Sequence, residues 1–327
     1  MRAAVCGSYG PPDVVEIEEL PSPAVGQGQV RVQIAAAAVN MADVLVVANQ
    51  YQIKVPTPFV VGSEFAGVVD AVDGAVSDVA PGDRVFGTAL VGAFAEEVVV
   101  PADAVTRIPT GVELRVAAAF GVAHRTAFHV LRSVARLQRG EELVVLGAGG
   151  GVGLAAVELG AALGASVTAV ASSPEKLEVA GSHGAGTLID VPPDELRQAL
   201  RGAHPDGVDV VVDPVGGDLA EPALRALRWG GRFVTVGYAS GSIPRIPLNL
   251  VMLKGIQIVG FEFRNFGVHM PDELRRNEDE LLELFAAGRI APYIGASFGL
   301  EDVVAALRFV ADRHAIGKVV LDIKGGF

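Results

Sequence analysis

Apolar and polar positions follow one pattern in the first part of the chain and another in the second. Up to about residue 122, short β-like runs are separated by proline, glycine and aspartate, as in Pro81-Gly82-Asp83. This pattern predicts an antiparallel, barrel-like β domain. The runs are residues 1–6, 14–18, 29–34, 66–70, 83–86 and 95–100.

Between residues 123 and 262, apolar strand signals alternate with helical segments, as a doubly wound parallel sheet requires. The tail at 263–327 reads as helices at 270–287 and near 300–312 and a strand at 318–323. It is too short for a domain of its own, so we expect it to return to the first domain. The predicted domains are therefore residues 1–122 with 263–327, and residues 123–262. The six strand signals are 143–146, 166–171, 187–189, 208–212, 232–236 and 256–260.

The most informative segment is a glycine-rich turn that follows the apolar run 143–146 and precedes a helical segment. A strand, a tight turn and a helix N-terminus, in this order, favour a dinucleotide-binding loop. The spacing Gly147-x-x-Gly150-x-x-Gly153 is looser than G-x-G-x-x-G, and a turn in a glycine-rich chain can arise without a ligand. The candidate cofactor residues here are Gly147, Gly150, Gly151, Val152 and Gly153.

Composition narrows the class of protein. The formal net charge of −12 argues against a nucleic-acid partner, which needs a basic face. The longest apolar stretch is interrupted by glycines and Glu158, which argues against a bilayer span, and no export signal is visible. The single cysteine, Cys6, is consistent with a reducing compartment. We expect a cytoplasmic protein.

Several short motifs occur together, in one order, along the whole chain. The motifs are Val39-Asn-Met-Ala-Asp43, Pro58-Phe-Val-Val-Gly-Ser-Glu-Phe-Ala-Gly67, Pro81-Gly-Asp-Arg-Val85, Gly92-Ala-Phe-Ala-Glu96, the glycine loop, Val170-Ala-Ser-Ser-Pro-Glu-Lys176, Asp209-Val-Val-Val-Asp-Pro-Val-Gly216 and Gly317-Lys-Val-Val-Leu321. With these motifs, the chain resembles the zinc-free NADPH:quinone oxidoreductase (zeta-crystallin-like) branch of the medium-chain dehydrogenase/reductase superfamily. The resemblance implies an α/β fold, with a GroES-like β-rich catalytic domain and a Rossmann NADPH-binding domain.

Zinc-dependent alcohol dehydrogenases of that superfamily differ from this chain at their metal ligands. The resemblance aligns their cysteine ligand with Asn40 and their His-Glu pair with Ser63 and Glu64. A four-cysteine structural lobe is also impossible with one cysteine, and the six histidines lack ligand spacing. We therefore expect no metal site.

The preference for NAD or NADP is determined about twenty residues after the glycine loop, where an NAD site has an aspartate or glutamate that binds the ribose hydroxyls. Here the sequence offers Ser172, Ser173 and Lys176, which suit a 2′-phosphate, so we predict NADPH. Glu175 would be the second residue of a new helix and would serve its dipole. The alternative is that Lys176 is an ordinary exposed lysine.

The resemblance assigns further residues to the cofactor site. It brings Arg313 towards the 2′-phosphate, whereas Val191 replaces a tyrosine that relatives place near the adenosine. Loops after two apolar strands should flank the ribose and nicotinamide, although plain turns would look similar. The expected contacts of this group are Thr126, Pro214, Gly237, Tyr238, Ser240 and Phe261.

In the first domain, we expect Asn40 to hydrogen-bond the nicotinamide or the substrate carbonyl, with a structural turn cap as the alternative. Asp43 and Glu64 look structural. Tyr51 lies eleven residues after Asn40, the spacing at which related enoyl-thioester reductases carry a proton donor, although it could equally be a pocket wall. Leu45 replaces an aromatic residue and Val47 replaces an arginine of the quinone reductases, which predicts a more apolar pocket.

The preferred interpretation is an NADPH-dependent, zinc-free quinone oxidoreductase. The alternatives are a 2-alkenal or enoyl-thioester reductase with Tyr51 as proton donor, and a non-catalytic NADPH-binding protein like the family's crystallins. The apolar run 256–260 reads as an exposed edge strand. Together with the resemblance, it predicts a homodimer.

Overall fold

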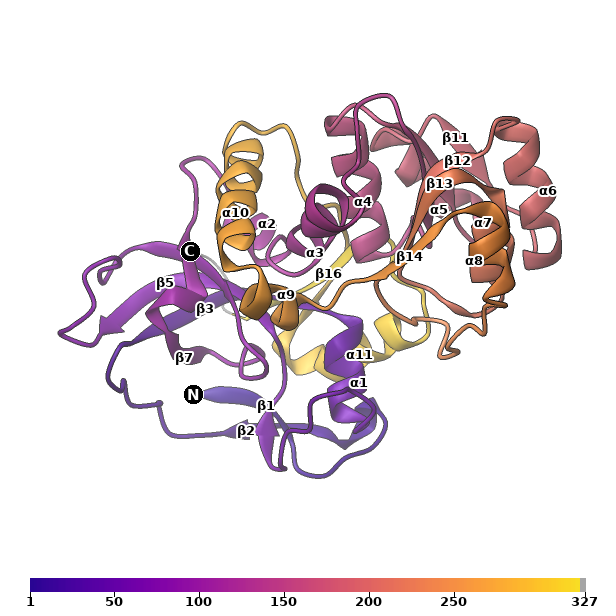
Figure 1. Cartoon of the computed structure of the whole chain (residues 1–327). Coiled ribbons are helices and arrows are strands. Elements are labelled where there is room, and N and C mark those ends of the chain that lie inside the picture. Colours follow the sequence, from indigo (N-terminus) through magenta and orange to yellow (C-terminus); the bar gives the residue numbers. More distant parts are fainter. Residues whose placement is uncertain (324–327) are drawn as a thin grey trace. The chain divides into compact units, whose positions relative to one another are not determined.

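The computed structural model describes residues 1–323, which form two compact units (Figure 1). The first unit combines Met1–Val122 with residues 291–323, and the second is Ala123–Ile290. Each unit has its own sheet and core, and each is described separately below.

The second unit is built on a six-stranded parallel sheet with the order β11-β10-β9-β12-β13-β14. This is the predicted doubly wound arrangement, and all six expected strands are present. The fifth strand begins earlier than expected because Leu227 also pairs with Val208 before a register shift. The strands are β9 (Glu142–Leu146), β10 (Ser166–Val170), β11 (Thr187–Ile189), β12 (Val208–Asp213), β13 (Leu227–Thr235) and β14 (Gln257–Gly260).

Helices of the second unit bury apolar residues against this sheet. Leu196 and Leu200 of α6, one turn apart, pack with Val144 and Leu146 of the central strand β9. The helices are α3 (Ala123–His129) with a π-helical turn at Val130–Val134, α4 (Gly151–Ala162), α5 (Pro174–Ser182), α6 (Pro193–Ala203), α7 (Ala220–Ala226), α8 (Asn249–Lys254), α9 (Phe263–His269) and α10 (Pro271–Ala286).

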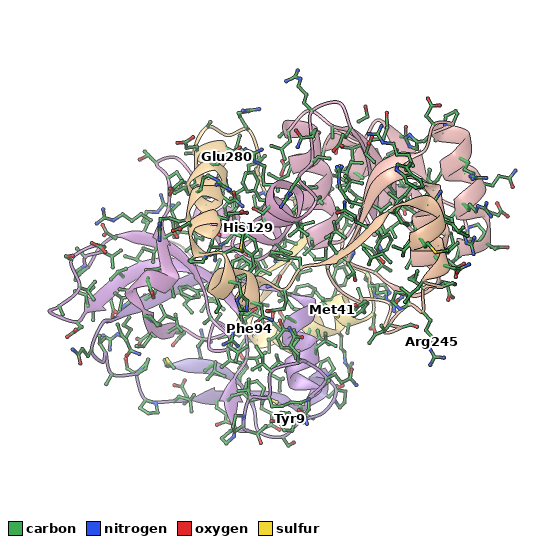
Figure 2. The ribbon with its side chains drawn as sticks, in the orientation of Figure 1. Tyr9, Met41, Phe94, His129, Arg245 and Glu280 are labelled. Carbon is green, nitrogen blue, oxygen red and sulfur yellow. The ribbon has the colours of Figure 1, made fainter. Side chains whose placement is uncertain are left out.

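The segment 263–290, which we expected in the first domain, packs with the second unit instead. Polar side chains of α10 explain this placement. Glu278 accepts hydrogen bonds from Arg125 at 2.8 and 2.9 Å, Asn277 donates to Ser133 at 2.8 Å, and Glu280 pairs with Arg132 at 2.8 Å. Figure 2 labels His129 on α3 and Glu280 on the neighbouring α10. The rest of the tail, residues 291–323, belongs to the first unit.

The first unit has a seven-stranded sheet of order β15-β16-β3-β5-β6-β8, in which β7 also pairs with β3, and a three-stranded sheet of order β2-β1-β4. Most of its pairings are antiparallel, as predicted. Strands β4, β8 and β15 and helices α1 and α2 were not predicted. The elements are β1 (Arg2–Cys6), β2 (Val15–Glu19), β3 (Gln29–Val39), α1 (Met41–Val47), β4 (Phe59–Val60), β5 (Glu64–Val72), β6 (Arg84–Thr88), β7 (Glu97–Pro101), β8 (Val105–Arg107), α2 (Leu114–Ala118), β15 (Ile294–Gly299), α11 (Val303–Ala311) and β16 (Lys318–Asp322).

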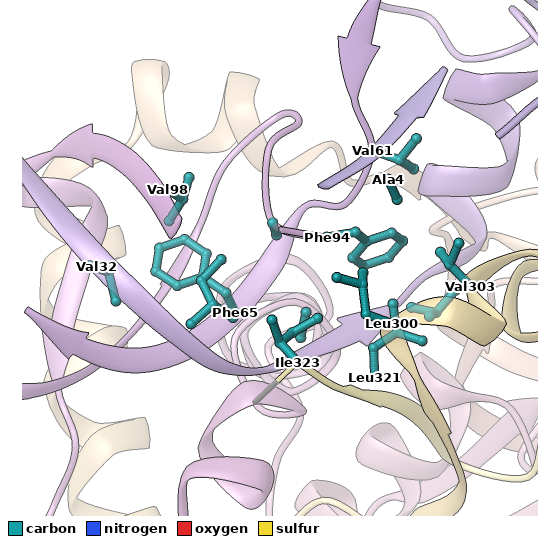
Figure 3. Packing of buried hydrophobic residues seen from close by; sticks show 14 of the residues in the cluster. Ala4, Val32, Val61, Phe65, Phe94, Val98, Leu300, Val303, Leu321 and Ile323 are labelled. Atoms are coloured by element: carbon teal, nitrogen blue, oxygen red, sulfur yellow. The ribbon is translucent and has the colours of Figure 1, made fainter. Parts of the chain in front are cut away.

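The C-terminal segment completes the core of the first unit (Figure 3). Leu321 of β16 and Val303 of α11 are buried in one cluster with Phe65 and Phe94. Strand β16 pairs antiparallel with β3, with Val319 opposite Val39. This pairing brings the start of β16 beside the residue that follows β3. No helix among residues 1–323 has the length and apolar character needed to cross a bilayer.

Candidate functional site

The glycine loop has the geometry expected of a phosphate-binding turn. Gly147, directly after β9, has φ of +61°, and Gly150 precedes the first residue of α4 and donates to the Gly147 carbonyl at 3.0 Å. A Cβ on Gly153 would lie 2.1 Å from the Gly147 oxygen, so only glycine fits there. The first turn of α4 therefore presents backbone N–H groups and the positive end of its dipole at the carboxyl edge of the sheet.

Lys176 lies beside this loop. A Cβ on Gly149 would be 2.6 Å from both Cβ and Cγ of Lys176, so the lysine stem passes over the glycine. Ser173 caps α5 by accepting from the backbone N–H of Lys176 at 3.4 Å. The Ser173 hydroxyl also lowers the pKa of Glu175 below its ordinary value, and Glu175 is the second residue of α5, as predicted. The chemistry of these groups fits a 2′-phosphate next to the glycine loop.

Two loops at the carboxyl edges of β12 and β13 are tied together. Ala239 donates to the Pro214 carbonyl at 3.1 Å, and Ser240 donates to the Val215 carbonyl at 2.9 Å. The buried Asp213 Oδ1 accepts from the backbone N–H groups of Val215 and Gly216, each at 2.8 Å. The predicted contacts Pro214, Gly237, Tyr238 and Ser240 all lie on these loops at one edge of the sheet, with the tyrosine exposed.

The carboxyl edge also contains buried polar atoms that lack a partner within residues 1–323. These are Oδ2 of Asp213 and Oγ1 of Thr235, and the two residues are direct partners in the β12–β13 register. Burial raises the pKa of Asp213 above its ordinary value. Orphaned buried groups of this kind are common where a ligand completes the hydrogen bonding. The two unpaired atoms therefore fit the prediction that the cofactor binds at the carboxyl edge of this sheet.

An aromatic cluster follows β14. Phe261 donates its backbone N–H to the Thr235 carbonyl at 3.1 Å, and its ring stacks on the buried His129 with centroids 6.3 Å apart. The His129 Nε2 is 2.9 Å from Glu278, and Arg125 lies over the Phe263 ring at 4.7 Å. This network holds Phe261 at the sheet edge, and Thr126 follows its member Arg125 on α3. The sequence did not reveal this network, because its residues are far apart in the chain: the positions of His129 and Glu278 differ by 149.

In the first unit, Asn40 lies at the centre of a buried polar network. Its Oδ1 accepts from Lys318 Nζ at 2.6 Å, and its Nδ2 donates to Glu64 Oε2 at 3.0 Å. Lys318 also donates to Glu64 at 2.8 Å, and the Asn40 backbone N–H donates to Asp43 at 2.7 Å at the start of α1. Asn40 is thus a helix cap as well as a candidate site residue. Lys318 also belongs to this polar network, which the sequence alone did not reveal.

This network does not suit zinc. At the aligned ligand positions, the ammonium of Lys318 already lies between Asn40 and Glu64, and neither residue offers a thiolate or an imidazole. Within residues 1–323, no group of three or more histidine, cysteine, aspartate or glutamate side chains could hold a metal ion.

Burial raises the pKa of Asp43 to about 7, against opposing hydrogen bonds from Ser63 and Asn40 and the charge of Lys318. The unfolded chain releases this proton near pH 4, so the carboxyl lowers stability progressively from about pH 4 to about pH 7. Asparagine does not titrate, so the free energy of unfolding of Asp43→Asn should rise relative to that of the wild type as the pH increases from about 4 to about 7. Urea denaturation at several pH values measures this difference. A difference that does not change with pH would contradict the prediction.

The other first-unit candidates lie near the ends of helices. Tyr51 follows α1, and its partly buried side chain packs on the core of this unit. Arg313 is exposed between α11 and β16, with φ of +62°. Asn40, Tyr51 and Arg313 therefore belong to the first unit, whereas the glycine loop, Lys176, Thr126, Phe261 and the β12 and β13 loops belong to the second.

Comparisons with known proteins fit these two units. Residues 26–110 match the model of the alcohol dehydrogenase GroES-like domain, and residues 151–285 match that of the zinc-binding dehydrogenases. The chain is 37% identical to the quinone oxidoreductase-like protein 2 homolog of Nematostella vectensis, over 99% of this chain and 89% of that protein. The chain belongs to the quinone oxidoreductase branch of the medium-chain dehydrogenase/reductase superfamily.

Solved members of this superfamily superpose closely on the chain. A mycobacterial protein complexed with NADPH has a TM-score of 0.91 and 29% identity, covering 99% of this chain and all of that chain (100%). The Escherichia coli quinone oxidoreductase complexed with NADPH has a TM-score of 0.90 and 25% identity, with the same coverage of 99% and 100%. The expected GroES-like and Rossmann architecture is confirmed, and membership of the superfamily makes the chain an oxidoreductase.

Proposed function

We propose that the protein is an NADPH-dependent oxidoreductase that passes a hydride to a quinone or a related conjugated carbonyl without zinc. The observation that carries the proposal is the Lys176 stem lying over Gly149, together with Ser172 and Ser173 where an NAD site would have an acid. The two solved relatives that bind NADPH and the relatives named quinone oxidoreductase support it.

In this proposal the residues of the chain hold and orient the cofactor. The N–H groups at the start of α4 bind the pyrophosphate, while Lys176, Ser172 and Arg313 bind the 2′-phosphate. The tied loops at Pro214 and Gly237 to Ser240, with Phe261 and Thr126, enclose the ribose and nicotinamide. NADPH, when bound, supplies the hydride.

On the acceptor side, the protein has to stabilise negative charge on an oxygen. A quinone becomes a delocalised phenolate, for which amide donors such as Asn40 suffice without a Lewis acid. The proposal is tested with NADPH deuterated at the transferred position. We expect slower quinone reduction with the deuterated cofactor. A purified protein that oxidises no NADPH in the presence of any quinone would refute the proposal.

Tyr51 distinguishes quinone reduction from enoyl reduction. An enoyl substrate needs a proton at carbon, and a positioned acid contributes about 10²–10⁴-fold, whereas solvent can protonate a phenolate. We predict that Tyr51→Phe changes kcat/KM for a quinone by less than about tenfold.

The comparison assay uses an enoyl thioester with the same variant. A loss of more than about a hundredfold that is confined to the enoyl thioester would favour the enoyl reductase function instead. Tyr9→Phe provides a matched control, because Tyr9 is another first-unit tyrosine and its hydroxyl donates to the Val55 carbonyl.

We also propose that two copies associate through β14. This strand is the outer strand of the six-stranded sheet, Ile258 on it is exposed, and Met252 and Leu253 on α8 are 72% and 64% exposed. An apolar edge of this kind favours pairing with a second sheet edge. We predict a dimer by light scattering at micromolar concentration, and a monomer for Ile258→Lys.

The opposite edge of the same sheet supplies the control for this prediction. Leu188 on β11 is exposed to a similar degree, so Leu188→Lys should leave the dimer intact. A wild-type monomer, or equal effects of the two lysines, would contradict the proposed interface.

A further inference from the structure

Lys318 is a buried charge that the proposed chemistry has not yet used. It is the first residue of β16, only 3% exposed, and the only lysine in the buried set of residues 1–323. Strand β16 pairs with β3 through Val319 and Val39, so Lys318 lies one step further along, opposite Asn40. A pairing between segments 278 residues apart in sequence thus places an ammonium directly beside Asn40.

Burying an ammonium is unfavourable unless its partners are well placed, and a pair of apolar residues would serve stability as well or better. Lys318 has two close partners, Asn40 Oδ1 at 2.6 Å and Glu64 Oε2 at 2.8 Å. Glu64 is fully buried and its other oxygen accepts from the Val122 backbone N–H at 2.7 Å. The ion pair is therefore fixed in place by the surrounding backbone.

The ion pair determines the orientation of the Asn40 amide. The amide oxygen faces the ammonium and the amide nitrogen faces the carboxylate, so rotation of the amide by half a turn would replace two attractive contacts with two repulsive ones. The second N–H of Asn40 makes only a long contact of 3.3 Å with the Ala38 carbonyl. Asn40 is also the member of this trio that is partly exposed. An oxygen atom outside the network would therefore replace only this long contact to the Ala38 carbonyl.

We propose that Lys318 is a positioning residue, which holds the Asn40 amide so that it presents an N–H, and not its carbonyl, to the acceptor or nicotinamide oxygen. The proposal rests on the proposed function. Without the ammonium, only the Glu64 carboxylate still orients the amide, so the amide is held less firmly and turns more easily to present its oxygen to an atom on which negative charge develops. A donor fixed in advance stabilises that charge without reorganisation during the reaction.

The test is a double-mutant cycle of Lys318→Met and Asn40→Ala, assayed for NADPH oxidation with a quinone. We expect each single variant to lower kcat about 10- to 100-fold with little change in KM for NADPH. Because Lys318 acts through Asn40, the kcat of the double variant should lie within about threefold of the kcat of Asn40→Ala.

The control for a purely structural role is Arg31→Met, which removes the Arg31–Asp70 ion pair between β3 and β5 of the same unit. Its thermal midpoint should fall while kcat stays at the wild-type value. Undiminished kcat in folded Lys318→Met, or losses that multiply in the double variant, would overturn the proposal. A wild type without turnover would instead refute the proposed function.

Glu64→Gln replaces Lys318→Met if the latter does not fold at the assay temperature. The glutamine keeps one neutral oxygen that Lys318 and Asn40 can share, but it lacks the negative charge and the acceptor for the Val122 N–H, so we expect a loss in kcat of about three- to tenfold. This loss should vanish in the Asn40→Ala background. Equal losses in both backgrounds would overturn the proposal.

Discussion

Gly153→Ala should weaken NADPH binding by at least about thirtyfold, or about 2 kcal/mol. The new methyl group would meet the Gly147 oxygen at 2.1 Å and the Gly147 carbonyl carbon at 2.8 Å. Both are backbone atoms, so the loop and the start of α4 have to move apart. The N–H groups that bind the pyrophosphate then lose their common geometry, and fluorescence titration with NADPH measures the loss.

Gly202→Ala is the matched control for this change. Gly202 is also helical and in the same unit, but a Cβ there meets nothing within 4 Å. Its NADPH affinity should equal that of the wild type, and its stability should be equal or slightly higher because alanine favours the helix. If Gly153→Ala binds NADPH as tightly as Gly202→Ala, the phosphate site is not at this loop.

Lys176→Ala should raise the dissociation constant for NADPH roughly 10- to 150-fold and leave that for NADH nearly unchanged. The expected loss is one charge-assisted hydrogen bond to phosphate, roughly 1.5–3 kcal/mol. NADH lacks the 2′-phosphate and therefore serves as an internal control. Titrating the wild type and Lys176→Ala with NADPH and with NADH gives the four dissociation constants to compare.

The position of Lys176 makes this prediction specific. Its stem passes over Gly149, so the ammonium is held near the loop that binds the pyrophosphate. Equal wild-type affinities for the two cofactors, or a parallel loss for both in the variant, would show that Lys176 does not read the 2′-phosphate.

The sheet of the second unit could be predicted from sequence because each of its strands is a short apolar run that ends in loop-forming residues. The cofactor loop was equally visible, since Gly147 and Gly153 are required by local geometry. Strand β8 and helix α2 were missed because each is too short, at three and five residues, to show a period.

The remaining features depend on tertiary contacts. Helix α10 joins the second unit through Asn277 and Glu278, whose partners on and after α3 lie more than 140 residues away. Lys318 reaches Asn40 only through the register of β16 on β3. Neither arrangement has a local sequence signal, because polar residues that pair across the fold look the same in sequence as solvated ones.

The central claim is that this chain reduces quinones with NADPH. The most direct measurement is steady-state NADPH oxidation by the purified protein with a panel of quinones, 2-alkenals and enoyl thioesters, compared as kcat/KM. We predict turnover with NADPH, with the largest kcat/KM for a quinone. Tight NADPH binding without turnover of any acceptor would contradict the claim and indicate a non-catalytic binding protein, and a strong preference for enoyl thioesters would contradict the choice of quinones.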